Sequence, residues 1–175
     1  IIVEAAPKTM SWITYEEALN RMRERIVPIE QVEEVSLGEA VGRVVREPLV
    51  APGDYPAFDN SAVDGYAVGT AQDAQGGSRL TVATTLAAGA SRAHELATGA
   101  AARVLTGSVV PDGAFAVVMQ EDVDVDVDGA TVVLRVAAEP GQHIRRRGDD
   151  FLAGTPLIGA GERLGAGGVG LLASQ

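Results

Sequence analysis

The sequence contains no cysteine, only two histidines, and few aromatic side chains: one Trp, three Tyr and three Phe in 175 residues. Without cysteine there is no disulfide framework and no thiolate metal site, so we expect a cytoplasmic protein. His94 and His143 lie far apart in the sequence, which disfavours a zinc site. No stretch approaches the roughly 18 uninterrupted apolar residues of a membrane span, and the first residues lack the basic segment of a secretory signal. We therefore expect no membrane partner.

Positive charge is also scarce. Lys and Arg total 14 against 24 Asp and Glu, which gives a formal net charge of −10. Such a balance disfavours binding to nucleic acid or to an anionic surface, because the whole chain repels polyanions. Any anionic ligand must therefore be bound at a local basic site.

Two short stretches near the start predict helices. Thr14-Tyr15-Glu16-Glu17 is a capping-box sequence followed by apolar residues at helical spacing, which predicts a helix over 14–26 that Pro28 ends. A second capping sequence over 36–39 predicts a short helix that Gly42 can close.

The rest of the chain is typical of strands and turns. Extended apolar runs are separated by glycine-rich turns, and the runs cover 80–86, 102–105, 115–120, 123–127 and 130–136. The Asp128-Gly129 dipeptide between two of these runs predicts a β-hairpin. The fold is therefore expected to be mainly β with an N-terminal α-helix.

Two motifs resemble known ligand loops but lack the required context. Residues 165–170 match a dinucleotide-binding glycine pattern, yet no strand–turn–helix unit is evident and no acidic residue follows about 20 positions later, so we expect plain turns. Asp124, Asp126 and Asp128 imitate the start of a calcium loop, but Arg135 stands where a bidentate Glu is required. Alternating Val and Asp predict a strand with one solvent-facing side instead.

Three segments concentrate polar groups that suit chemistry. Residues 58–68 (FDNSAVDGYAV) carry carboxylates, an amide and a hydroxyl, whereas turn capping would also explain them. Residues 105–114 (LTGSVVPDGA) end a strand in a glycine turn, expected to expose N–H groups for an oxyanion. Residues 144–150 (IRRRGDD) carry three arginines that suit tetrahedral oxyanions. The alternative for this run is a solvated charge cluster neutralised by Asp149 and Asp150.

Taken in order, these three segments resemble the molybdopterin molybdenumtransferase family, which includes the E domain of gephyrin. The resemblance covers nearly the whole chain, with His143 and Gly69 standing where the family usually has Asn and Arg. It implies an enzyme that inserts molybdate into adenylated molybdopterin and releases AMP with the help of Mg²⁺, acting as a homodimer. The chain is then a partial enzyme that ends before the family's α/β domain. The alternative is a dimerising scaffold that binds peptides, as gephyrin's E domain does.

The resemblance also implies site residues and domains. Its functional positions match Asp64, Thr106 and Asp150 as catalytic residues and Arg145 as an anion-binding residue. We expect Asn60 and Ser61 to assist in anion binding, and Asp64 and Asp150 to order the Mg²⁺ through its waters. The domains are expected to be an N-terminal arm and helix (1–31), a discontinuous β domain (32–50 plus 155–175) and an inserted β domain (51–154).

Overall fold

A computed structural model describes residues 12–89 and 95–175 of the chain, so His94 lies outside the described residues. The chain divides into two compact units, one that ends at Val35 and one over Ser36–Gln175, and each is described by itself. In the part of the chain that the structure describes, no helix is long and apolar enough to cross a membrane.

The first unit holds the helix α1 (Tyr15–Arg23). Its start is the one predicted, because the hydroxyl oxygen of Thr14 accepts a hydrogen bond from the Glu17 N–H at 3.2 Å. Arg21 then pairs with Glu17 one turn away at 2.6 Å. The helix ends three residues before the predicted position 26. None of its residues is buried, although several are apolar.

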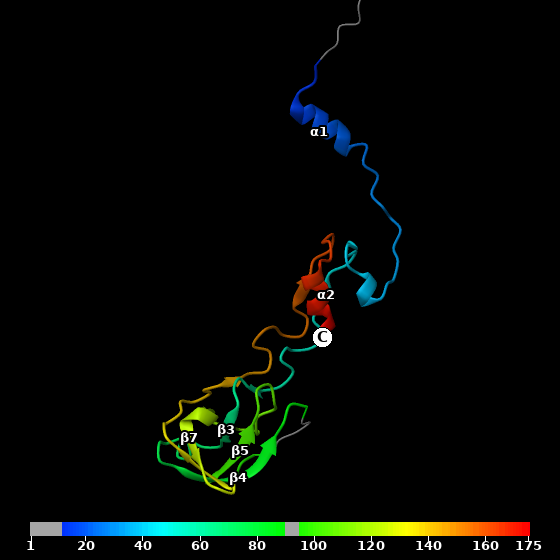
Figure 1. The fold of residues 1–175 in the computed structure, drawn as a ribbon. Coiled ribbons are helices and arrows are strands. Elements are labelled where there is room, and N and C mark those ends of the chain that lie inside the picture. The colour runs from blue at the N-terminus through cyan, green and yellow to red at the C-terminus, as the bar shows by residue number, and fades with distance from the viewer. Residues whose placement is uncertain (1–11, 90–94) are drawn as a thin grey trace, which may run out of the picture. The chain divides into compact units, whose positions relative to one another are not determined.

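The second unit is built around a six-stranded sheet with the order β6-β3-β5-β4-β8-β7 (Figure 1). Its strands are β3 (Gly65–Val68), β4 (Arg79–Leu86), β5 (Ala100–Val104), β6 (Ala116–Met119), β7 (Val123–Val125) and β8 (Thr131–Leu134). The pair β4 and β5 is parallel and the other pairs are antiparallel. The expected mainly β fold is confirmed.

Alternate residues of each strand pack on opposite faces of this sheet. On β3, Tyr66 and Val68 belong to one buried cluster, whereas Ala67 belongs to the other. On β6, Val118 and Val117 divide in the same way. Both faces are therefore covered over β3, β5 and β6, which explains why these strands are rich in Val and Ala with little polar alternation. The longer strand β4 has several exposed residues.

The hairpin predicted at Asp128-Gly129 joins β7 to β8. Gly129 has a φ of +72°, a left-handed conformation that glycine adopts without strain. The short strand β7 has one buried residue followed by two exposed ones. Asp126, directly after this strand, accepts a hydrogen bond from the Thr131 N–H at 3.0 Å.

A smaller cluster lies outside the sheet. It is formed by η1 (Leu37–Glu39), β1 (Leu49–Val50), β10 (Pro156–Ile158) and α2 (Ala166–Ala173). Here β1 pairs antiparallel with β10, so the two segments that flank residues 51–154 are hydrogen-bonded to each other. The boundaries of the inserted domain stay a prediction.

The helix α2 corrects the sequence interpretation, which expected plain turns over 165–170. One of its glycines, Gly168, is explained by close packing. A Cβ on Gly168 would lie 3.3 Å from the side chains of both Ile158 and Leu164, tighter than ordinary contact. Val169 and Leu172 pack against the same small core. Tertiary contacts thus stabilise a helix that local propensity disfavours.

Gly65, at the start of β3, provides a test of the sheet's packing. A Cβ at this position would overlap the carbonyl oxygen of Val118 on β6. We expect Gly65→Ala to lower the free energy of unfolding by about 1–3 kcal/mol, as overpacking does. As the matched control, Gly167→Ala on α2 meets nothing within 4 Å, and in a helix it should stabilise by about 0.5–1 kcal/mol. Urea titrations measure both, and an unchanged midpoint for Gly65→Ala would contradict the packing argument.

Candidate functional site

The three polar segments identified in the sequence meet around one short strand, β2 (Asn60–Ser61). It pairs antiparallel with β9 (Ile144–Arg145), with Asn60 opposite Arg145. Asn60 also forms a bridge to Val109, in the segment that follows β5. Segments far apart in the sequence therefore lie side by side at one place.

Asp64 and Thr106 form the first polar contact of this region. One carboxylate oxygen of Asp64, Oδ1, accepts hydrogen bonds from both the N–H and the hydroxyl of Thr106, each at 2.7 Å. These two bonds, the main-chain bond first, lower the pKa of Asp64, and the positive charge of Arg103 adds to the effect. The carboxylate is thus held ionised and fixed in orientation.

The turn after β5 does not present free N–H groups, contrary to the sequence expectation. The N–H groups of residues 106–108 donate to the carboxylate of Asp64 and to the carbonyl oxygens of Ser61 and Leu105. They stabilise the turn and tie it to β2. In this structure these N–H groups already have acceptors within the chain, and Thr106 fixes one carboxylate oxygen of Asp64. A catalytic role for Thr106 stays a prediction.

Asn60 and Ser61 stabilise the chain around β2 through side-chain hydrogen bonds to nearby carbonyl groups. Both are buried, with 6% and 1% of their surface exposed. The Ser61 hydroxyl donates to the carbonyl of Val63 at 2.6 Å, and the amide of Asn60 donates to the carbonyl of Phe58 at 3.2 Å. Ser61 would have to exchange this bond before it could donate to an anion. For Asn60, anion binding stays a prediction.

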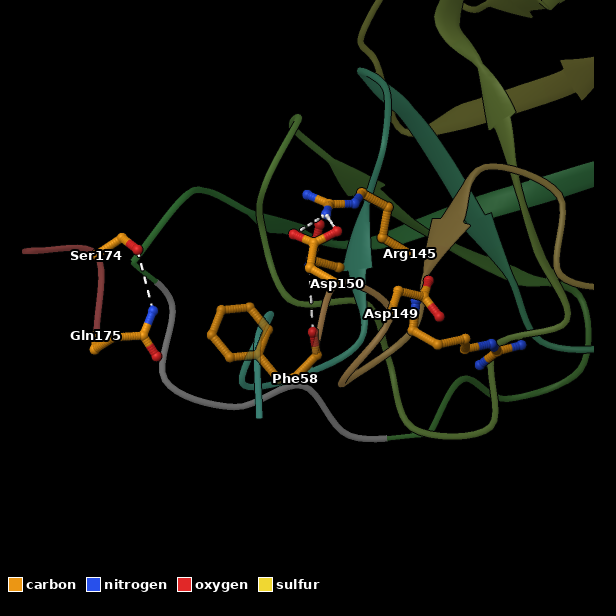
Figure 2. A network of polar contacts seen from close by, with 8 residues as sticks. Phe58, Arg145, Asp149, Asp150, Ser174 and Gln175 are labelled. Atoms are coloured by element: carbon orange, nitrogen blue, oxygen red, sulfur yellow. Dashed lines mark hydrogen bonds and ion pairs between the residues drawn. The ribbon is translucent and has the colours of Figure 1, made fainter. Parts of the chain in front are cut away.

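Arg145 and Asp150 form the second polar contact. Both carboxylate oxygens of Asp150 accept hydrogen bonds from the same guanidinium nitrogen of Arg145, at 2.8 and 2.7 Å. Figure 2 shows this guanidinium lying against the carboxylate. The hydrogen bond and charge of Asp150 raise the pKa of Arg145. Both side chains are more than 40% exposed, at 44% and 43%, so the pair is accessible to a ligand.

The other two arginines of the run find partners that the sequence interpretation did not identify. Arg146 pairs with Asp59 at 2.6 Å, and Arg147 pairs with Asp54 at 2.6 Å. The alternative from the sequence, in which Asp149 and Asp150 neutralise the whole run, therefore accounts for Arg145 but not for the guanidinium groups of the other two arginines. Asp149 accepts the main-chain N–H of Arg146 at 2.6 Å rather than its guanidinium. Asp59 lies within the FDN motif, whereas nothing in the sequence singles out Asp54.

A pocket of about 580 Å³ lies beside Arg145. Two charged residues line it, Arg145 and Asp54, and much of the remaining lining is apolar. Asn60 and Gly107 also line the pocket, whereas Asp64, Thr106 and Asp150 are not among its lining residues. Phe58 is 45% exposed and lines the pocket together with Arg145, and Figure 2 shows its ring. Tyr55 in the same wall stacks on Phe151 at 5.4 Å. An apolar pocket with a few converging polar groups is the usual form of a small-molecule site.

The fit of these residues to Mg²⁺ differs between the two candidate ligands. Asp64 fits a water-mediated ion, because no described residue donates a hydrogen bond to its second oxygen. Asp150 fits less well, since both its oxygens already accept from Arg145. No group of three or more acidic or histidine side chains among the described residues could hold a metal by itself.

Comparison with known proteins identifies relatives of the chain. Residues 13–175 match the family model described as the MoeA N-terminal region, domains I and II. A molybdopterin molybdenumtransferase of Haemophilus influenzae is 37% identical over 162 residues, which cover 93% of this chain and 40% of that protein. Molybdopterin molybdenumtransferase 2 of Mycobacterium tuberculosis is 41% identical over 145 residues, covering 80% of this chain and 35% of that protein.

The chain also resembles a solved structure of a MoeA protein. The crystal structure of the molybdopterin biosynthesis MoeA protein from Pyrococcus horikoshii OT3 matches with a TM-score of 0.84 and 38% identity. The match covers 94% of this chain and 44% of that one. The chain therefore spans less than half the length of the proteins it resembles.

The contact between Asp64 and Thr106 predicts a measurable titration. Thr106→Val removes the hydroxyl donor and keeps the main-chain N–H, so the pKa of Asp64 should rise toward its ordinary value without reaching it. Because the depressed pKa contributes stability that is lost as pH falls through it, the variant should also begin to lose stability at a higher pH. An NMR titration of the Asp64 carboxyl carbon measures the shift. An unaltered titration curve would show that the hydroxyl bond contributes nothing.

Proposed function

Because the chain belongs to the family of the MoeA N-terminal region, domains I and II, we propose that it forms part of a molybdopterin molybdenumtransferase. The whole enzyme would insert molybdate into adenylated molybdopterin and release AMP. The observation that carries the proposal is that β2 joins the segments of two fixed contacts, Asp64 with Thr106 and Arg145 with Asp150. Asn60 of β2 lies opposite Arg145, and the carbonyl of Ser61 accepts the Gly107 N–H. The residues of these two contacts are those at which the resemblance implies function.

The charge distribution supports this choice of substrate. Adenylated molybdopterin and molybdate are both anions, and the chain carries a net charge of −10. A cation at the pocket is needed to overcome this repulsion, and Arg145 lines the pocket. Its forked guanidinium can bind two oxygens of a phosphate or molybdate at once. In this proposal, Asp150 keeps the guanidinium oriented until the anion arrives.

The apolar wall of the pocket suits the rest of the substrate. The exposed ring of Phe58 offers a flat surface in the pocket that Arg145 also lines. Aromatic side chains stack favourably on planar ring systems, and the substrate contains such rings. Binding energy from this remote contact would hold the reacting phosphate in place at Arg145, as proximity effects require.

Asp64 is proposed to act on the reacting group itself. Thr106 fixes one of its oxygens, which leaves the other directed away from that bond. A carboxylate held ionised in this way can hold the waters of a Mg²⁺ or accept a proton. When bound, Mg²⁺ would neutralise charge on the phosphate as the anhydride bond breaks.

The remaining parts of the enzyme are also proposals. The chain spans 40% of the length of the Haemophilus influenzae relative. We propose that further residues of a full-length protein complete the pocket, and that the protein acts as a homodimer. On this view the 175-residue chain alone forms no molybdenum cofactor from adenylated molybdopterin and molybdate. A fluorescence assay for released AMP tests this directly, and turnover by the isolated chain would contradict it.

Substituting Asp64 separates a catalytic role from a turn-forming one. An Asx turn needs an oxygen and no charge, so Asp64→Asn would be tolerated if the residue were structural. In the full-length protein that carries this segment, we expect the substitution to lower molybdenum insertion at least tenfold, equivalent to about 1.4 kcal/mol in the transition state. The melting temperature should change little.

The matched control is Asp124→Asn. Asp124 is an exposed aspartate that pairs with Arg135 at 3.6 Å, and it lies on β7, a strand that carries none of the proposed site residues. It should leave both turnover and melting temperature near those of the parent. Near-normal turnover in Asp64→Asn would return that residue to a structural role. Equal losses in both variants would point to a general effect of surface charge.

A further inference from the structure

The three consecutive arginines at 145–147 are separated by their partners. Arg145 pairs with Asp150 within its own turn, whereas Arg146 and Arg147 pair with acidic residues of the segment that leads into β2. Of the three, Arg145 lines the pocket. Of three adjacent arginines, one is thus available at the pocket, and the other two are held by aspartates.

Asp59 holds both the side chain of Arg146 and the main chain of Arg147. Its Oδ2 accepts a hydrogen bond from the Arg146 guanidinium at 2.6 Å, and its Oδ1 accepts the main-chain N–H of Arg147 at 2.8 Å. Burial raises the pKa of the Asp59 carboxyl, but these two bonds together hold it below its ordinary value. The carbonyl of Asp59 also accepts the Val110 N–H at 3.2 Å, which ties it to the turn that holds Thr106.

Without Asp59, the Arg146 guanidinium would have other acidic partners close by. Its own main-chain N–H already contacts the Asp149 carboxylate at 2.6 Å. The charge of Asp149 also acts on Arg145, whose pKa it helps to raise. A released guanidinium would therefore compete with Arg145 for Asp149 and Asp150, because charge-assisted pairs form readily over such short separations.

We propose that Asp59 is a positioning residue, which holds the Arg146 side chain and the Arg147 main chain so that Asp150 stays paired with Arg145 and Arg145 faces the pocket. The inference rests on the proposed function, because its main measurement is molybdenum insertion. Asp59 itself would touch neither substrate nor metal. The effect of losing Asp59 on the KM would depend on the presence of Arg146. A general structural role would show no such dependence.

The test is a double-mutant cycle in the full-length protein that carries this segment. Asp59→Asn keeps an oxygen that can accept the Arg147 N–H but loses the charge that holds Arg146. We expect it to raise the KM for adenylated molybdopterin about tenfold with a smaller change in kcat, since Arg145 binds the anion before reaction. Arg146→Gln alone should change the KM little.

The double variant Asp59→Asn/Arg146→Gln decides the question. Because Gln at position 146 leaves no released guanidinium to compete with Arg145, the KM of the double variant should return to within about threefold of the Arg146→Gln value. Such non-additivity between two substitutions is expected only of residues that interact. A double variant as impaired as Asp59→Asn would overturn the proposal, and so would an unchanged KM in Asp59→Asn. If Asp59→Asn does not fold, Asp59→Glu replaces it. Glu keeps the charge, so its KM should stay near that of the parent, and a tenfold rise would overturn the proposal.

Failure of the proposed function would be seen separately, as absence of molybdenum insertion in the parent protein. The cycle can then be followed in the 175-residue chain through the side-chain NMR signals of Arg145. These should shift in Asp59→Asn and return to the parent position in the double variant. Signals that stay shifted in the double variant would overturn the positioning role whatever reaction the protein catalyses.

Discussion

The antiparallel pairing of β2 with β9 is the constraint on which the candidate site depends. It places Asn60 opposite Arg145, while the bridge from Asn60 to Val109 adds the turn after β5. Main-chain hydrogen bonds thus bring three distant segments to one place before any side chain is considered. The buried side chains of Asn60 and Ser61 then satisfy nearby carbonyl groups, which keeps the junction intact away from water.

Electrostatics at this junction follow from the scarcity of positive charge. In a chain with a net charge of −10, three adjacent arginines repel one another and attract every nearby carboxylate. The structure resolves this by giving each arginine its own aspartate, and those at Arg146 and Arg147 come from the segment before β2. The Arg146–Asp59 and Arg147–Asp54 pairs also join the two ends of the chain segment, residues 54–147, that contains the sheet. Pairing of this kind adds specificity of arrangement more than stability, because exposed ion pairs contribute little free energy.

The two contacts of the site differ in what they hold. Thr106 uses both its donors to fix Asp64, so a carboxylate that stays charged is presented in one orientation. Asp150 holds Arg145 through a single guanidinium nitrogen, which leaves the other donors of the fork available. In the proposed function, Arg145 on β9 would bind an anion, and Asp64, between β2 and β3, would hold a cation. Such a division suits a reaction in which a negatively charged phosphate is both bound and displaced.

Local sequence determined the features that depend on neighbouring residues: the capped start of α1 at Thr14, the hairpin at Asp128-Gly129, and the three segments whose motifs resemble one family. Caps and tight turns are set by side chains within a few positions, so they can be read without a fold. The tertiary structure alone decided the glycine-rich helix α2, the internal use of the N–H groups at 106–108, and the partners of Arg146 and Arg147. Each of these depends on packing or hydrogen bonds between segments far apart in the chain, which spacing and composition do not encode.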